Sequence, residues 1–295
     1  MGEKRIGVDL GGTRTKIGVV EDGKILEEIM VDTPVSEGYA AVLQKIAEGA
    51  GMLLRHYPEI TKAGMGVPGL IDTKEGIVCY SNNFGWENVP FVADMQKYLP
   101  LKIKIANDAQ CAALGEALYG AGKEYGRVAL FTLGTGVGGG FVKDGRIETD
   151  RYGSMAYIFG HAVVDARGRF CNCGRQGCLE AYASAGAVAR MSEGLFEKDQ
   201  SAKDIFTAAK KNDTRACHIV EEFLQYISIG AVNIANILRP EIIVIGGGVS
   251  ASADMILPRI EAELKKGVYG YAYAPVKTAC AGLQNQAGMA GAANL

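Results

Sequence analysis

The sequence has no run of basic residues. It is 295 residues long, and its 31 Lys and Arg residues are balanced by 33 Asp and Glu residues, which gives a formal net charge of −2. A charge so close to zero gives no electrostatic reason to expect a nucleic acid or an anionic membrane as a partner. We therefore expect a chain that binds neither.

Long hydrophobic runs are also absent. The longest apolar segment, residues 227–238, is interrupted by Ser228, Asn233 and Asn236 and is too short to span a bilayer. The first twelve residues are typical of a strand and a turn, not of a charged region followed by an apolar stretch, so no signal peptide is predicted. We expect a cytoplasmic protein.

The remaining composition is that of an ordinary globular chain, with 48% hydrophobic and 22% charged residues. The length favours two domains, and no long linker interrupts the chain. Apolar strand-like segments alternate with segments of helical periodicity, which predicts an α/β fold. Strands are expected at 5–9, 15–20, 24–31, 60–67, 102–106 and 241–245, and helices at 36–56 (with Ser36 as a possible cap), 109–119, 184–196, 202–211, 215–238, 254–266 and 287–295.

Two glycine-rich turns, one at Gly11-Gly12 and one at Gly134–Gly140, form an internal repeat. Each follows an apolar strand, leads into another strand and ends at an Asp-Gly hairpin signal, Asp22-Gly23 in the first copy and Asp144-Gly145 in the second. The second copy is one residue shorter. Such a repeat predicts two related halves.

The residues of these turns suit phosphoryl transfer. Glycine lets backbone N–H groups approach an anion that side chains would hold off. Between the turns, Asn107-Asp108 lies at a predicted strand-to-helix junction, where Asp108 could take a proton from an attacking hydroxyl. The second turn also fits the dinucleotide pattern G-x-G-x-x-G, but it leads into a strand and not a helix, which argues against a dehydrogenase. No P-loop string occurs.

Taken together, these motifs resemble the ROK sugar kinases (repressor, open reading frame, kinase) of the actin-like ATPase superfamily. The strings that carry the resemblance are Asp9-x-Gly-Gly-Thr, Asn107-Asp108, Leu133-Gly-Thr-Gly-Val-Gly-Gly-Gly and Ile245-Gly-Gly-Gly-Val-Ser. They occur in the family's order over essentially the whole chain. The resemblance implies a two-domain, ribonuclease H-like fold with duplicated halves, and an ATP-dependent hexose kinase that is often a homodimer.

The resemblance also implies roles for individual residues. Asp108 would be the general base, and Asn107, Asp108, His161 and Glu180 would bind the sugar. ATP and Mg²⁺ would be held by the residues of the three glycine motifs, namely Asp9, Gly11, Gly12, Thr13, Gly134, Thr135, Gly136, Gly138, Gly139, Gly246, Gly247 and Gly248. The expected domains are 1–111 with 281–295, carrying the first phosphate turn and the base, and 112–280, carrying the second phosphate turn, a zinc loop and the adenosine site.

Three cysteines are clustered, whereas Cys79, Cys111, Cys217 and Cys280 are scattered and are expected to be small buried hydrophobes. Cys171, Cys173 and Cys178 lie within eight residues, and His161 precedes them by ten. Three thiols and one imidazole form a closed tetrahedral set, which predicts a structural zinc ion. The spacing also matches the ROK pattern C-x-C-G-x-x-G-C preceded by Gly-His. A disulfide framework is not expected in a cytoplasmic chain.

One position departs from the ROK pattern. The family motif E-x-G-H has a glutamate that binds sugar hydroxyls near carbons 2 and 3, and Ile158 occupies its place here. A charge-assisted hydrogen bond contributes roughly 1.5–3 kcal/mol, so an ordinary glucose pose would lose about tenfold to a hundredfold in affinity. The pocket would then prefer a sugar that differs at those carbons.

Three alternatives to such a kinase remain open from the sequence. The first is a weak or silent sugar-binding sensor on the same scaffold. The second is a kinase for a carboxylate acceptor, which would need an arginine pair at the acceptor site, and the third is the dehydrogenase. A DNA-binding repressor is not expected, because only eight residues precede Asp9, fewer than a winged-helix segment needs.

Overall fold

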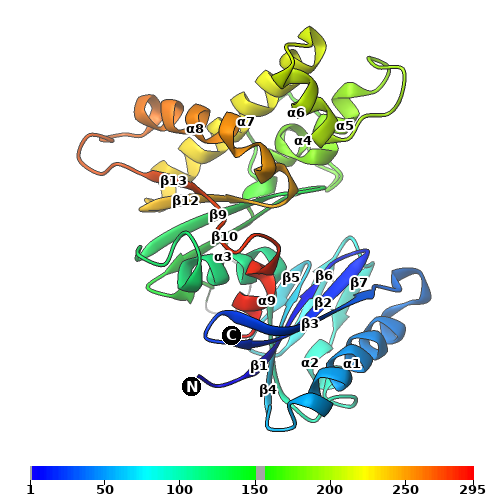
Figure 1. The fold of residues 1–295 in the computed structure, drawn as a ribbon. Coiled ribbons are helices and arrows are strands. Elements are labelled where there is room, and N and C mark those ends of the chain that lie inside the picture. The colour runs from blue at the N-terminus through cyan, green and yellow to red at the C-terminus, as the bar shows by residue number, and fades with distance from the viewer. Residues whose placement is uncertain (1, 151–156) are drawn as a thin grey trace. The chain divides into compact units, whose positions relative to one another are not determined.

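The computed structural model describes residues 2–150 and 157–295. The chain divides into two compact units (Figure 1). Unit 1 comprises Met1–Glu124, Gly140–Tyr157 and Asn285–Leu295, and unit 2 comprises Tyr125–Gly139 and Ile158–Gln284. The domain bounds expected from the sequence stay a prediction. Within the described residues, no helix is both long enough and apolar enough to cross a membrane.

The first sheet has the strand order β3-β2-β1-β4-β8. Its hairpin strands pair antiparallel, whereas β1, β4 and β8 are mutually parallel. The strands are β1 (Arg5–Leu10), β2 (Arg14–Glu21), β3 (Lys24–Asp32), β4 (Lys62–Val67) and β8 (Lys102–Asn107). Each strand that the sequence predicted in this part of the chain is confirmed to within two residues.

The second sheet repeats that order. Its strands follow one another as β11-β10-β9-β12-β13, with bounds β9 (Arg127–Leu133), β10 (Val137–Lys143), β11 (Arg146–Ile147), β12 (Ile242–Gly246) and β13 (Lys277–Cys280). Asp22 and Gly23 both have positive φ, and so do Asp144 and Gly145, as a two-residue type I′ hairpin requires. The duplicated halves predicted from the sequence are therefore confirmed in topology and in turn geometry. The division between the units falls within β10, after Gly139.

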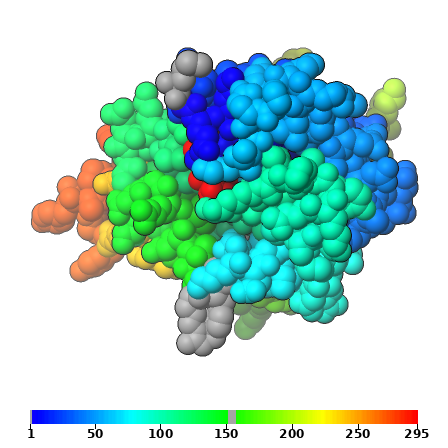
Figure 2. Space-filling model, turned by 90° about the horizontal axis from the view of Figure 1, so that it is seen from below, coloured from blue at the N-terminus to red at the C-terminus, as the bar shows by residue number. Residues whose placement is uncertain are grey.

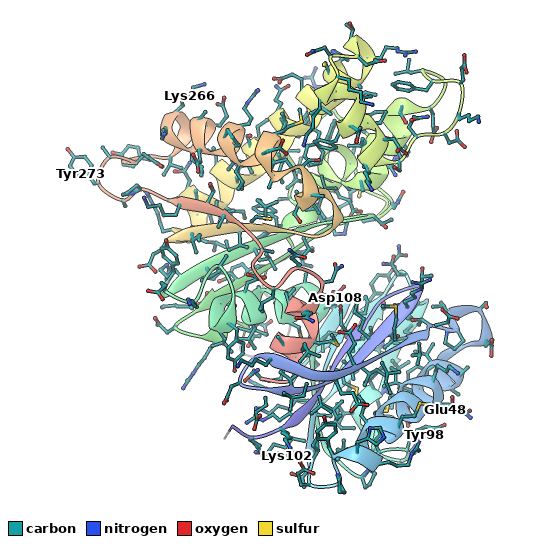
Figure 3. All side chains as sticks on the ribbon, in the orientation of Figure 1. Glu48, Tyr98, Lys102, Asp108, Lys266 and Tyr273 are labelled. Atoms are coloured by element: carbon teal, nitrogen blue, oxygen red, sulfur yellow. The ribbon has the colours of Figure 1, made fainter. Side chains whose placement is uncertain are left out.

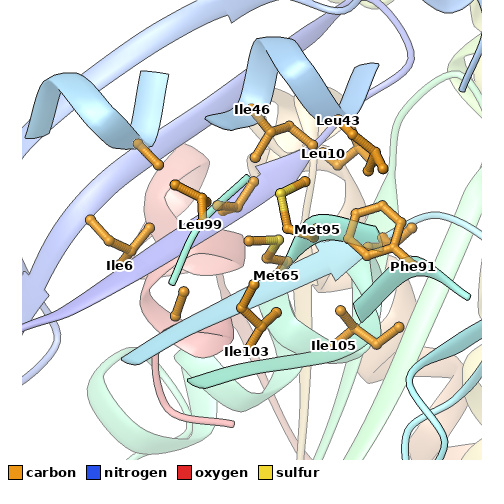
Figure 4. Packing of buried hydrophobic residues seen from close by; sticks show 14 of the residues in the cluster. Ile6, Leu10, Leu43, Ile46, Met65, Phe91, Met95, Leu99, Ile103 and Ile105 are labelled. Carbon is orange, nitrogen blue, oxygen red and sulfur yellow. The ribbon is translucent and has the colours of Figure 1, made fainter. Parts of the chain in front are cut away.

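The core of unit 1 lies between its sheet and the helices α1 (Tyr39–His56) and α2 (Phe91–Met95). Figure 4 shows side chains such as Ile46, Met65 and Phe91 packed together there. The prediction that Ser36 caps the first helix is wrong. Gly38 precedes the helix without a side-chain cap, and Ser36 lies in a 3-10 turn, Val35–Glu37.

Two helices of unit 1 pack against each other through glycines. A Cβ atom on Gly115 of α3 (Asp108–Tyr119) would lie 2.3 Å from the Ala287 carbonyl oxygen, and one on Gly291 of α9 (Ala287–Ala292) would lie 1.7 Å from that of Cys111. Such an approach is open only to glycine. The helix predicted at 287–295 is confirmed over its first six residues, and residues 287–293 are all buried. Accordingly, little of this red segment reaches the surface in Figure 2.

Unit 2 contains five helices among its described residues, α4 (Glu180–Ala183), α5 (Ala185–Ser192), α6 (Ala202–Lys210), α7 (Thr214–Leu238) and α8 (Ala253–Gly267). The helix predicted at 184–196 is shorter than expected. Ser184 caps it by accepting a hydrogen bond from the Ala187 N–H at 2.9 Å. It ends at Ser192, whose hydroxyl bonds back to the Ala189 carbonyl, and Gly194 with positive φ follows.

A small third sheet in unit 1 was not predicted. It has the order β5-β6-β7 and comprises Leu70–Asp72, Ile77–Ser81 and Trp86–Val89. These strands are short, and several of their residues are exposed. Their sequence therefore carries little apolar alternation to reveal them.

Candidate functional site

Asp108 is the first residue of α3, and it follows directly on the parallel strand β8 (Figure 3). The helix begins there because the Asn107 side chain caps it. Asn107 Oδ1 accepts hydrogen bonds from the backbone N–H groups of Ala109 and Gln110, at 3.0 and 3.2 Å. Asn107 Nδ2 donates to the Gly69 carbonyl at 3.1 Å. These bonds fix the backbone from which the Asp108 carboxylate projects.

Burial and, to a lesser degree, the negative charge of Asp9 together raise the pKa of Asp108 to about 6. Asp9 lies near the end of β1 in the same unit, and burial raises its pKa as well. Two half-buried carboxylates thus influence each other in unit 1. A carboxylate with a pKa near 6 is a better proton acceptor than an ordinary aspartate and is still ionised at neutral pH.

Lys16 is a residue of this site that the sequence analysis missed. Its Nζ lies 3.6 Å from Asp9 Oδ2 and donates to the Asn285 carbonyl at 2.9 Å. Asp9 and Lys16 are cross-strand partners in the β1–β2 hairpin. The register of a hairpin around Gly11-Gly12-Thr13 would have placed them opposite each other.

The first glycine turn joins β1 to β2. The Gly11 N–H closes it with a hydrogen bond of 3.1 Å to the Arg14 carbonyl. A Cβ atom added at Gly12 would meet nothing within 4 Å. The chain's own packing therefore does not require glycine at that position. Close approach of an anion to the backbone would require it.

The second glycine turn, in unit 2, has the same property at Gly134. A Cβ atom there would meet nothing within 4 Å, and the Gly134 N–H bonds to the Gly136 carbonyl at 3.0 Å. The turn itself is residues 134–136, because Gly138 and Gly139 already lie in β10. Gly139 leaves room for the Phe159 ring, whose Cδ2 would be 2.3 Å from an added Cβ. Packing is thus a reason for glycine at 139, and its contact with a nucleotide stays a prediction.

The third glycine motif lies beside the second. Gly246 ends β12, and Gly247 has a φ of 81° with its Cβ position 2.5 Å from the Leu133 carbonyl oxygen. Leu133 is the last residue of β9, directly before Gly134. The two motifs that the sequence predicts for phosphate and adenosine are therefore brought together within unit 2.

The four predicted zinc ligands also come together in unit 2. The ligand atoms of His161, Cys171, Cys173 and Cys178 all lie within 4.8 Å of one another. Cys171 Sγ is 3.7 Å from His161 Nδ1, and Cys173 Sγ is 3.6 Å from Cys178 Sγ. Thiolates on a tetrahedral zinc ion at 2.3 Å would be about 3.8 Å apart, so the donor set and its spacing fit zinc. All seven cysteines are free thiols, as expected.

Two tyrosines anchor residues 161–178, which we call the metal loop. The rings of Tyr182 and Tyr226 stack at 3.8 Å, and both hydroxyls donate to Asp165 Oδ2, at 3.3 and 3.4 Å. The Tyr182 hydroxyl also accepts from the Arg169 N–H at 2.6 Å. The ligands therefore project from a loop that is anchored to α4 and α7.

Glu180, a predicted sugar ligand, adjoins the cluster. It begins α4, two residues after Cys178, and one of its oxygens is 3.8 Å from Cys171 Sγ. His161 ends a short 3-10 turn, Phe159–His161, and Ile158 directly precedes that turn with 46% of its surface exposed. Ile158 thus presents an apolar side chain to its surroundings where the ROK motif has a carboxylate.

Comparison with known proteins settles the family. The model of the ROK family matches residues 5–295. The chain belongs to the ROK family. Over 99% of its length it is 36% identical to the glucokinase of Thermotoga maritima, of which the match covers 96%.

Solved structures of the ROK family have the same fold. A ROK family glucokinase from Streptomyces griseus, crystallised with glucose and AMPPNP, superposes with a TM-score of 0.85 at 30% identity, covering 99% of this chain and 98% of that one. A ROK family transcriptional regulator, a homologue of the E. coli MLC protein, also gives a TM-score of 0.85, at 26% identity, covering 99% of this chain and 77% of that one. The two-domain α/β fold expected from the sequence is therefore confirmed. The family contains both kinases and regulators.

Proposed function

We propose that this ROK protein is an ATP-dependent hexose kinase that transfers the γ-phosphoryl group to a sugar hydroxyl, O6 in an aldohexose. The observation that carries the proposal is Asp108. It is a half-buried carboxylate at a capped helix start, with its pKa raised to about 6. Similarity to glucokinases over nearly the whole chain supports the same reaction.

In this mechanism Asp108 accepts the proton of the attacking hydroxyl as the O–P bond forms. The ionised carboxylate is the active form, and burial makes it basic enough to attract that proton. Protonated Asp108 could not serve as the base. The chemistry therefore requires a pH above the pKa of this group.

Backbone N–H groups of the glycine turns would bind the phosphate oxygens, with Gly12 and Gly134 leaving the backbone open to them. Asp9 would hold Mg²⁺. Its pKa is raised by burial and Lys16 lies at 3.6 Å, so its charge is only partly compensated. When bound, Mg²⁺ supplies positive charge to the phosphate oxygens. Gly246, Gly247 and Gly248 would lie against the adenosine.

On the sugar side, Asn107, Asp108, His161 and Glu180 are the proposed ligands. Asn107 Oδ1 already accepts two backbone N–H groups, and Nδ2 uses one of its hydrogens for Gly69. One N–H of Asn107 is left to donate to a sugar oxygen. His161 would use one ring nitrogen for zinc and the other for a hydroxyl, and the zinc ion would be structural because four protein ligands fill its coordination.

Ile158 supports an altered sugar preference. Its exposed alkyl side chain offers no hydrogen bond near carbons 2 and 3 of a glucose-like pose, and glucose would lose roughly tenfold to a hundredfold in affinity there. We propose a preferred substrate that differs from glucose at those carbons or is more apolar there. Ile158→Glu should then raise kcat/KM for glucose relative to the preferred sugar.

A coupled ADP-release screen across aldohexoses, ketohexoses and N-acetylated sugars tests the proposal. We expect turnover on at least one of them and a loss of about 10²–10⁴ in kcat for Asp108→Asn with nucleotide binding retained. Full activity of that variant would remove Asp108 from the mechanism. Glucose as the best substrate, together with no effect of Ile158→Glu, would refute the altered preference.

A sugar-binding sensor is the second candidate, and the missing carboxylate at Ile158 together with the similarity to a ROK transcriptional regulator favours it. A sensor would bind sugar in calorimetry but release no ADP with any sugar of the screen. We also propose that the chain forms a homodimer, which light scattering during gel filtration would detect as twice the mass of 31.2 kDa.

A further inference from the structure

Glu180 connects the metal loop to the second glycine turn. Its Oε2 accepts a hydrogen bond from the Val137 N–H at 2.9 Å, and its Oε1 lies 3.8 Å from Cys171 Sγ. A Cβ atom at Gly136 would be 2.3 Å from the same Oε2. One carboxylate therefore touches both a predicted zinc ligand and the backbone of the turn, all within unit 2.

Among the described residues, the three residues of the turn are held by backbone contacts and not by packing of their own side chains. Gly134, Thr135 and Gly136 bring no apolar side chain to bury, and Thr135 is exposed. Glycine also loses more backbone entropy on ordering than other residues do. Two hydrogen bonds hold Gly134, one from its N–H to Gly136 and one from the Ala185 N–H to its carbonyl at 2.8 Å. A charge-assisted bond from Glu180 to the Val137 N–H, where the turn meets β10, would therefore add to the order of the segment.

The position of Glu180 is itself set by the metal loop. Glu180 is the first residue of α4, and Cys178 precedes it by two residues. The Leu179 N–H bonds to the Ala162 carbonyl at 2.9 Å, next to His161. Ordering of the four ligands therefore places the carboxylate against the turn.

We propose that Glu180 is a positioning residue for the phosphate-binding turn, in addition to the sugar contact that the ROK resemblance implies. Through it, the metal loop orders the backbone that receives the nucleotide. This inference rests on the proposed function. It also commits the Val137 N–H to Glu180, so that the phosphate oxygens must use other donors of the turn.

Calorimetry with Mg·AMPPNP in the absence of sugar tests the proposal, because a residue that only binds sugar leaves that affinity unchanged. We expect Glu180→Ala to weaken nucleotide binding about tenfold, the lower end of what one charge-assisted hydrogen bond contributes. Glu180→Gln should stay within about threefold of wild type, because the amide oxygen still accepts from Val137. Glu193→Ala, an exposed glutamate just after α5, is the matched control and should match wild type.

Hydrogen exchange gives a second readout that does not depend on the nucleotide. The Val137 amide should exchange slowly in wild type and in Glu180→Gln and at least tenfold faster in Glu180→Ala, with zinc content unchanged in all three. Wild-type nucleotide affinity in Glu180→Ala, or equal weakening in Glu180→Gln, would overturn the positioning role. Should Glu180→Ala fail to fold, rapid exchange of Val137 in the wild type would overturn it instead. Failure of wild type to bind any nucleotide would refute the kinase proposal itself, which keeps the two outcomes distinct.

Discussion

At the scale of single residues, the environment of Asp108 explains how an aspartate could act as a base near neutral pH. The sequence places it at a helix start, where free N–H groups favour a negative charge. The fold then opposes that charge by burial and by the proximity of Asp9, and the net result is a pKa of about 6. The proposed activity requires the ionised form of this side chain, whereas burial makes that form less stable.

The pH dependence of catalysis follows from that pKa. We expect kcat/KM to be level above about pH 7 and to fall about tenfold per pH unit well below pH 6, because the protonated carboxyl cannot accept the sugar proton. Initial rates between pH 4.5 and 8.5, under conditions where the coupling enzymes are not limiting, measure this. A profile that stays level down to pH 5 would show that Asp108 is not the titrating base.

Asp108→Asn should stabilise the fold at neutral pH. The folded pKa of about 6 lies above the ordinary aspartate value of 3.8, so the folded state binds the proton more tightly than the unfolded state does. Stability from this group is full below about pH 4 and is lost as the pH rises to about 6. The difference between these two pKa values corresponds to about 3 kcal/mol, and partial exposure of the side chain reduces this to roughly 1–2 kcal/mol.

For a protein of this size, that gain corresponds to an increase in Tm of about 2–6 °C. Scanning calorimetry of wild type and Asp108→Asn at pH 7.5 and at pH 4.5 would measure it. The difference in Tm between them should shrink at the lower pH. A variant that is less stable than wild type at both pH values would contradict the account.

At the scale of structural elements, the metal loop combines a small buried cluster around Cys171 and Cys178 with a set of four metal-binding side chains. Four donors converge, and the tyrosine pair behind them anchors Asp165. A metal that binds the folded loop and not the unfolded chain stabilises by mass action, about 4 kcal/mol when its free concentration is a thousandfold above Kd. We therefore expect bound zinc to stabilise the loop.

Cys173→Ser is expected to abolish zinc binding and to lower Tm by several degrees, because the hard hydroxyl is a poor substitute for a thiolate. Cys173 is the more accessible thiol of the cluster, so the change leaves no buried cavity. Metal analysis and thermal melting provide the measurements. Cys217→Ser is the control, since Cys217 is exposed on α7, contrary to the sequence-based expectation that it is buried. Equal zinc content in both variants would rule out Cys173 as a ligand.

At the scale of the whole molecule, two sheets with equivalent strand orders carry the three glycine motifs. The second motif leads from β9 into β10, a strand. A nicotinamide dinucleotide needs a helix start at that point to bind its pyrophosphate. The ligand expected to stabilise the molecule is thus an adenosine triphosphate and not a dinucleotide.

Thermal shift distinguishes these ligands. At a hundredfold excess over Kd, Mg·AMPPNP should stabilise the protein by about 2.7 kcal/mol and raise Tm by several degrees. NADH at the same concentration should leave Tm unchanged. A shift with NADH alone would favour the dehydrogenase that the glycine pattern by itself permits.

The sequence alone determined the features that depend on residues close together in the chain. The Asp-Gly hairpins, the start of α3 at Asn107-Asp108 and the choice of His161 and three cysteines as candidate zinc ligands all follow from local backbone preference or from ligand chemistry. The pairing of Asp9 with Lys16 was within reach of the sequence too, because hairpin register fixes it. These features are encoded within short segments.

The tertiary structure alone decided the contacts between distant segments. The raised pKa of Asp108 comes from burial and from Asp9, far back in the sequence, and the bond from Val137 to Glu180 joins a sheet to the metal loop. The same holds for Gly139, which packing against Phe159 accounts for, and for the small sheet of short, half-exposed strands. Such contacts form only when loop closure and close packing bring the segments together, and no local pattern in the sequence records which distant neighbour each residue will meet.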